Sequence, residues 1–172
     1  IALQGVIAFG MTFAIISGEM DLSISSTVAL TGVIVALVAG KLRNAGIMTL
    51  EQAAIVGIVA AIAVAGLIGL FNGFILTKFN VPSFIITLAM MNIVYGVAAI
   101  LSGGFPVTTL PRWFNVLGAG KIGSIPIPAL ILLLVFMVTH IVLAHTKFGR
   151  EVYAVGGNEQ SAKLMGLPVG RT

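Results

Sequence analysis

The sequence has few charged residues and no cysteine, and both absences narrow its class. Asp, Glu, Lys and Arg make up only 8% of the 172 residues, whereas 59% are hydrophobic. Ordinary globular domains carry roughly 25% charged residues, and a soluble fold of this length could not bury so much apolar surface. Without cysteine there is no disulfide framework, no thiolate metal site and no cysteine nucleophile. The composition therefore predicts an integral membrane protein.

Motifs for catalysis and for nucleic-acid binding are also missing. The sequence has no Walker A loop and no GxSxG elbow. His140 and His145 miss the i, i+4 spacing of a helical zinc site. The nine basic residues give a net charge of +4 but form no stripe with aromatic residues. We expect a non-enzymatic chain without a metal site, bound cofactor or nucleic-acid partner, so any ATP hydrolysis would belong to another subunit.

Five mostly apolar runs follow one another along the chain. The longest clean example, residues 53–77, has no ionisable side chain. At about 1.5 Å per residue it exceeds a hydrocarbon core of roughly 30 Å. The runs do not alternate as barrel strands do, so their backbone amides require helices. The sequence predicts an all-α, polytopic transmembrane bundle of about five spanning helices, at residues 1–18, 22–40, 53–77, 79–103 and 122–145, followed by a cytoplasmic segment, residues 146–172.

The distribution of basic residues predicts the orientation. Four follow the fifth run, which assigns that end to the cytoplasm by the positive-inside rule. Alternation then places Lys78 inside and the loop around residues 102–125 outside. Five basic residues fall inside and four outside, so the bias rests mainly on the tail. The tail residues are Lys147, Arg150, Lys163 and Arg171.

Small residues recur at every fourth position of the third run. Such a stripe lets a second helix approach closely in lipid, where the hydrophobic effect no longer drives association. The alternative is that an Ala-rich helix produces the stripe by chance. The residues expected to support helix packing are Gly57, Ala61, Ala65, Gly69 and Gly73.

Polar residues between and within the runs are costly in a membrane unless they are paired or wet. Glu19 and Asp21 must lie near a surface or a watery cavity. Asp21 or Ser23 is a good N-cap for a helix starting near Ile24, and a role along a transport path is compatible with capping. Asn72, Asn92 and Tyr95 are further polar candidates inside the spans. Each could instead bond a neighbouring helix, which is the more frequent use of an amide inside a span.

The polar tail predicts a short helix of its own. Asn158 can cap its start and Gly166 can end it, while Glu159 and Lys163 suit the helix dipole and pair at i, i+4. A helix this short is unstable alone and must dock on something. We expect its apolar residues to fit a partner's groove; the alternative is a helix lying on the inner leaflet. The apolar residues are Ala162, Leu164 and Met165.

The tail and several landmarks together resemble a known family. The stretch Gly149–Gly166 resembles the cytoplasmic loop of ribose-type ABC importer permeases, the inner-membrane subunits of bacterial monosaccharide uptake systems. The match spans nearly the whole chain, although Glu19, Ser25 and Tyr95 depart from the family's usual residues. The chain resembles the N-terminal half of such a permease without its first helix. The other landmarks are Gly10-Met11-Thr12, Asp21-Leu22-Ser23, Asn72-Gly73, Pro82–Leu88 and Gly103–Pro106.

The resemblance implies a transport role in the bacterial cytoplasmic membrane. The partners would be a second permease subunit (a homo- or heterodimer), cytoplasmic ATPase subunits that bind ATP and Mg, an external sugar-binding protein, and membrane lipid. The tail helix would couple ATP hydrolysis to the bundle through Gly156, Gly157, Asn158, Glu159, Ala162, Lys163, Leu164, Met165 and Gly166. Residues expected along the transport path or its gate are Asp21, Ser23, Asn72, Phe84, Thr87, Asn92 and Phe105.

Two other functions remain open at this point. A permease for branched-chain amino acids would share the helices and the coupling loop but lacks the Asp-Leu-Ser turn found at Asp21–Ser23. A secondary transporter would need buried ion-coupling charges, and only Glu19 and Asp21 approach that requirement.

Overall fold

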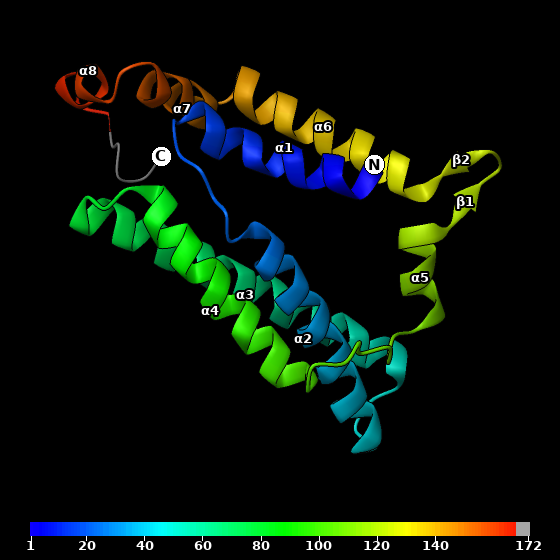
Figure 1. The fold of residues 1–172 in the computed structure, drawn as a ribbon. Coiled ribbons are helices and arrows are strands. Elements are labelled where there is room, and N and C mark those ends of the chain that lie inside the picture. The colour runs from blue at the N-terminus through cyan, green and yellow to red at the C-terminus, as the bar shows by residue number, and fades with distance from the viewer. Residues whose placement is uncertain (168–172) are drawn as a thin grey trace. The chain divides into compact units, whose positions relative to one another are not determined.

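The computed structural model describes residues 1–167, so Arg171 lies outside the described residues (Figure 1). The described part contains eight helices and two short strands. It forms two compact units, one made of Leu22–Val116 and the other of Ile1–Asp21 with the chain from Leu117 onward. Each unit has its own packing, and each is described separately.

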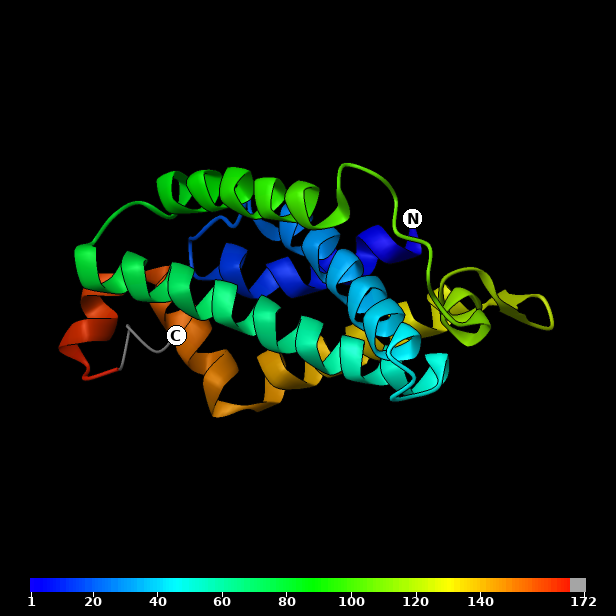
Figure 2. The same cartoon turned by 90° about the horizontal axis from the view of Figure 1, so that it is seen from below.

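The Leu22–Val116 unit is built on three long helices. They are α2 (Ile24–Asn44), α3 (Leu50–Phe79) and α4 (Ser83–Ser102). Helix α2 packs against both α3 and α4, and it runs in the same direction as α4 (Figures 1 and 2). Leu30 of α2 packs with Val94 and Ala98 of α4 in one buried cluster. A second cluster joins α2 to the start of α3 and is covered by Trp113; its members are Ala39, Ala53 and Ala54.

Local sequence explains both ends of α3. Thr49 Oγ1 accepts a hydrogen bond from the Gln52 amide at 3.4 Å, and Gln52 Oε1 accepts one from the Thr49 amide at 3.3 Å. This capping box satisfies amides that the first helical turn leaves without partners. Asn80 ends the helix in the left-handed conformation with φ 51°, a region in which asparagine is enriched. Pro82 is the N-cap of α4, so residues 80–82 reverse the direction of the chain.

The second unit contains the first helix and the carboxyl-terminal part of the chain. Helix α1 (Ala2–Ile16) packs along α6 (Ile127–His145), where the rings of Phe9 and Phe136 lie 5.4 Å apart (Figure 1). Helix α6 is followed by α7 (Lys147–Gly157) and α8 (Glu159–Leu164). A hairpin of two-residue strands, β1 (Lys121–Ile122) and β2 (Ile125–Pro126), precedes α6, and α5 (Arg112–Ala119) lies where one unit gives way to the other.

The all-α prediction is confirmed apart from this small hairpin. Four helices, α2, α3, α4 and α6, are long and apolar enough to cross a membrane. Helix α1 has 15 residues, about 22 Å, which is shorter than the roughly 30 Å hydrocarbon core. The sequence did not predict α5 or α7. Helix α7 contains Gly149, Gly156 and Gly157, which lower helix propensity, and its contacts with neighbouring elements override that preference.

The small-residue stripe of α3 has two different environments. Gly57 and Ala61 are buried, and the Gly57 backbone lies directly against that of Val35 in α2. A side-chain carbon at Gly57 would lie 2.8 Å from the Val35 carbonyl oxygen. Ala65 is half-buried, whereas Gly69 and Gly73 are exposed and have open space beside them. Within this chain, only the first half of the stripe supports close packing of α2 on α3.

Because Gly57 is packed against α2 and Gly69 is not, substitutions at these two positions test the packing of α2 on α3. Gly57→Ala should destabilise the full-length protein by about 1–3 kcal/mol, because the added methyl group overlaps the backbone of α2. Gly69→Ala meets no atom, and the higher helix propensity of alanine should make it neutral or stabilising by up to about 1 kcal/mol. The thermal unfolding midpoint of each variant in detergent checks this. Equal midpoints for the two variants would contradict the packing assigned to α2 and α3.

Candidate functional site

Buried polar side chains gather within the Leu22–Val116 unit. They come from the first turn of α2, the last third of α3 and the first turns of α4. The central contact is a hydrogen bond of 3.2 Å that Asn72 Nδ2 donates to Ser23 Oγ. Asn72 is only 6% exposed, and its Oδ1 has no hydrogen-bond partner among the described residues. The buried polar residues of this unit are Ser23, Ser26, Asn72, Ser83 and Thr87.

The Ser23–Asn72 contact places the start of α2 well inside the length of α3. Asn72 precedes Phe79, the last residue of α3, by seven residues, which is about 10 Å along the helix axis. Ser23 immediately precedes the first residue of α2. The amino end of α2 therefore lies roughly 10 Å below the turn at residues 80–82. Helix ends at depth are found in transporters, where irregular backbone is tolerated beside a polar cavity.

The structure revises the expected helix cap. Ser23 occupies the N-cap position of α2 but its side chain makes no capping hydrogen bond. Its hydroxyl instead accepts from Asn72, so the expectation that Ser23 caps through its side chain is wrong for this structure. The Ser23 carbonyl accepts from the hydroxyls of Ser26 and Thr27 at 2.8 and 2.9 Å. Asp21 is half-buried, and its capping role stays a prediction.

A groove with polar and apolar lining lies between α2 and α4. It has a volume of about 360 Å³ and is lined by Ser25, Ser26, Ala29, Met91, Asn92 and Tyr95. Asn92 donates one hydrogen bond to the Leu88 carbonyl of its own helix at 2.8 Å. Of the residues expected along a transport path, only Asn92 lines this groove. The sequence did not predict that Ser25 lies beside Asn92, because the depth at which α2 starts cannot be seen from its apolar run.

The remaining path candidates lie apart from the groove. Phe84 of α4 is exposed, and so is Phe105 in the loop that follows α4. Thr87 is buried, and its hydroxyl donates to the Ser83 carbonyl one turn earlier at 2.8 Å. Ser23 and Asn72 lie together beneath the start of α2. The structure thus brings together two of the seven candidates and places a third in the groove.

The short tail helix α8 has the capped ends that the sequence predicts. Asn158 Oδ1 accepts a hydrogen bond from the Ser161 amide at 2.8 Å. At the other end Gly166 has φ +76°, which lets its amide reach the Lys163 carbonyl and the Leu167 amide reach the Ala162 carbonyl. This pair of bonds is a Schellman motif. Glu159 and Lys163 pair at 2.6 Å on the exposed face.

The expected apolar docking face is smaller than predicted. Leu164 and Met165 are 90% and 68% exposed, but Ala162 is completely buried. Ala162 points into the chain because α8 folds back on α7, so its side chain is not available to a partner. The exposed residues of the proposed coupling set are Gly156, Gly157, Asn158, Glu159, Lys163, Leu164, Met165 and Gly166.

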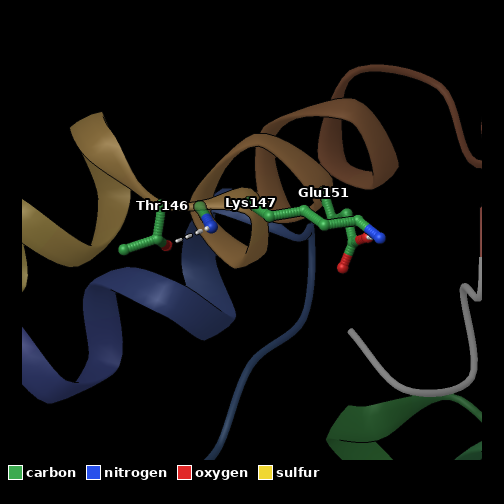
Figure 3. A network of polar contacts seen from close by, with 4 residues as sticks. Thr146, Lys147 and Glu151 are labelled. Carbon is green, nitrogen blue, oxygen red and sulfur yellow. Dashed lines mark hydrogen bonds and ion pairs between the residues drawn. The ribbon is translucent and has the colours of Figure 1, made fainter.

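A single residue, Thr146, joins α6 to α7. Its hydroxyl donates to the Val142 carbonyl of α6. It also accepts from the Gly149 amide of α7 at 3.1 Å (Figure 3). Gly149 permits the sharp junction, because a side-chain carbon there would overlap the carbonyl groups at the end of α6. Figure 3 also shows Lys147 beside Glu151 at 3.7 Å, a pair with one exposed member that contributes little stability.

Helix α7 also contacts the end of α1. The rings of Phe13 and Phe148 lie 6.1 Å apart, and Val152 is almost completely buried. Gly156 approaches α1 so closely that a side-chain carbon would overlap the Ile16 carbonyl oxygen. Helices α1, α6 and α7 are therefore joined by backbone contacts that leave no space for a side chain.

No group of three or more His, Cys, Asp or Glu side chains that could hold a metal ion occurs in the part of the chain that the structure describes. His140 and His145 are both exposed near the end of α6, with ring centroids 5.9 Å apart.

Comparison with known proteins identifies relatives along the whole chain. The ribose import permease protein of Escherichia coli (strain K12) is 36% identical over 99% of this chain and 51% of the relative. The ribose import permease protein of Bacillus subtilis (strain 168) is 35% identical over 99% of this chain and 51% of the relative. The L-arabinose transport system permease protein of Escherichia coli (strain K12) is 36% identical over 100% of this chain and 50% of the relative. No solved structure matches.

The chain spans about half the length of the curated relatives it matches. A protein family described as "Branched-chain amino acid transport system / permease component" matches residues 1–172. The match includes the four membrane-spanning helices and the capped tail helix. The chain therefore belongs to this family of transport permease components.

Proposed function

We propose that the protein is a permease subunit of an ATP-driven importer for a monosaccharide in the bacterial cytoplasmic membrane. The similarity to ribose and L-arabinose permeases over 99–100% of the chain carries this proposal. Four apolar helices of sufficient length support a multi-pass subunit. Because the relatives are about twice as long, we propose this activity for a permease of the relatives' length.

The proposed assembly assigns different tasks to different chains. This chain contributes part of the translocation path, and we assign no cofactor to it. ATP and Mg bind to separate cytoplasmic ATPase subunits, and an external binding protein delivers the sugar. A second permease subunit completes the path, as either an identical or a related copy. The capped tail helix, with Leu164 and Met165 exposed, supports contact with an ATPase.

Import of branched-chain amino acids is the second candidate, favoured by the description of the matching family. The named relatives favour sugar instead. Reconstitution separates the two. The full-length permease, its ATPase and its binding protein should accumulate radiolabelled ribose or L-arabinose in proteoliposomes only when ATP is supplied. Accumulation of leucine but neither sugar would contradict the proposal, and so would uptake driven by a proton or sodium gradient without ATP.

The geometry supports a mechanical route from the tail to the bundle. Force applied at α8 passes to α7, on which α8 packs. Thr146 fixes α7 to the end of α6, and Gly156 seats α7 against the end of α1. At Gly149 and Gly156 backbone lies directly against backbone, and the Thr146 hydroxyl bonds both helices at their junction, so a displacement of α7 moves α1 and α6 with it. We assign the coupling of ATP hydrolysis to this route.

Two adjacent glycines test the coupling route. Gly156→Ala forces α7 away from the Ile16 carbonyl, whereas Gly157→Ala meets no atom. The clash costs about 1–3 kcal/mol if the helices stay in place, so the contact should open instead. We expect Gly156→Ala to lower ATP-dependent sugar uptake by about tenfold or more, with normal membrane abundance and normal ATPase co-purification. Gly157→Ala should transport like the parent.

The coupling assignment has a clear counter-result. If Gly156→Ala and Gly157→Ala give the same uptake and the same stimulation of ATP hydrolysis by the sugar-loaded binding protein, the contact between α7 and α1 does not transmit coupling.

A further inference from the structure

The groove between α2 and α4 contains exposed polar side chains, which are unusual on the surface of membrane-spanning helices. Most exposed side chains of α4 are apolar, among them Ile85, Ile93 and Ile100. Ser25, Asn92 and Tyr95 are also exposed, but all three line the same groove. Polar groups facing hydrocarbon would be costly. Their convergence in one groove is consistent with a polar ligand or water at this position.

The groove lies near the middle of the membrane-spanning part of the unit. Asn92 follows Ser83, the first residue of α4, by nine residues, about 13 Å along the helix. It precedes Ser102, the last residue, by ten residues, about 15 Å. Ser25 and Ser26 reach this level because α2 begins at depth, where Ser23 contacts Asn72. The depth of the groove thus follows from the buried Ser23–Asn72 pair.

The chemistry of the lining fits a neutral ligand with several hydroxyl groups. The exposed polar groups of the lining are the Ser25 hydroxyl, the Asn92 amide and the Tyr95 phenol, and the lining has no Asp, Glu, Lys, Arg or His. Ser26 also lines the groove, but it is buried and its hydroxyl donates to the Ser23 carbonyl. Asn92 uses one N–H on the Leu88 carbonyl and keeps its second N–H and its carbonyl oxygen for a ligand. Tyr95, Met91 and Ala29 add apolar surface, which suits the C–H face of a sugar ring. A zwitterionic amino acid would find no charged partner among these side chains.

The size of the groove is also suitable. About 360 Å³ falls at the lower end of the range for small-molecule sites.

We propose that the groove lined by Ser25, Ser26, Asn92 and Tyr95 is a sugar-binding site part-way along the translocation path. Asn92 donates to and accepts from sugar hydroxyls, and Tyr95 packs on the ring. This assignment rests on the proposed function, because it names the place in this chain where the transported sugar is bound. It also makes this permease contribute to substrate selection, in addition to any separate binding protein.

Thiol labelling tests whether water reaches the groove and whether a sugar binds there. Single cysteines are introduced into a cysteine-free, full-length permease assembled with its ATPase and binding protein. Asn92→Cys and Ser25→Cys should react with a charged methanethiosulfonate reagent at least tenfold faster than Ile93→Cys. Ile93 is the control because it is exposed on the same turn of α4 but lies outside the groove. Ribose or L-arabinose supplied during ATP turnover should slow the groove reactions, whereas leucine should not.

Transport measurements test the role of Asn92. Asn92→Leu keeps a similar volume but removes the amide, and it should lower sugar uptake by tenfold or more. Membrane abundance and ATP hydrolysis stimulated by the loaded binding protein should stay close to those of the parent, which a merely structural defect would not allow. Ile93→Leu, at the same depth, should transport normally.

The possible failures are distinguishable. If the parent imports sugar but Asn92→Cys does not react and Asn92→Leu transports normally, the groove is covered by protein or lipid and the site is wrong, while the proposed function stands. If leucine, and neither sugar, protects Asn92→Cys, the ligand class is wrong. If the parent itself imports no sugar, the proposed function fails first, and the assignment of the groove fails with it.

Discussion

The hydrogen bond between Asn72 and Ser23 determines where α2 begins, and the polar features of the Leu22–Val116 unit depend on that position. An amide inside a membrane-spanning helix has no water to satisfy it, so it must find a partner within the protein. Asn72 finds Ser23, which holds the amino end of α2 about 10 Å inside the end of α3. Ser25 and Ser26 then face Asn92 and Tyr95 across one groove. If α2 began at the level of Pro82 instead, its serines would lie beside Ser83 and the groove would have no polar wall on one side.

The other unit depends on close backbone approach. Gly149 lets α7 begin directly after α6, and Gly156 lets α7 rest on the Ile16 carbonyl at the end of α1. Thr146 pairs one carbonyl at the end of α6 and one amide at the start of α7, which are groups that a one-residue junction would otherwise leave without helical partners. A tail that is packed in this way is suited to transmit motion, because glycine contacts between backbones have no rotamers through which a displacement can be lost. The exposed Leu164 and Met165 are then the residues through which a partner would act on α7.

Features that depend on local chemistry were predictable from the sequence. The apolar runs gave the long helices, and Asn158, Glu159, Lys163 and Gly166 gave the ends of α8. Features that depend on distant partners were not. Ser23 occupies the N-cap position of α2 as the sequence suggests, but its hydroxyl bonds Asn72, 49 residues away, and makes no capping bond. Ala162 resembles part of an exposed apolar face but is buried. The glycines of α7 lower its helix propensity. The need for glycine at position 156 is seen only in the structure, where the Ile16 carbonyl lies directly beside it.

A double-mutant cycle on Ser23 and Asn72 tests the central claim most directly. Unfolding free energies of the full-length permease in mixed micelles would be measured for Ser23→Ala, Asn72→Leu and the double variant. The account predicts a coupling energy of about 0.6–1.7 kcal/mol, the range found for hydrogen bonds between membrane helices. Asn72→Leu combined with Ser102→Ala, at the far end of α4, should show no coupling. Purely additive effects of Ser23→Ala and Asn72→Leu would contradict the contact and, with it, the depth at which α2 begins.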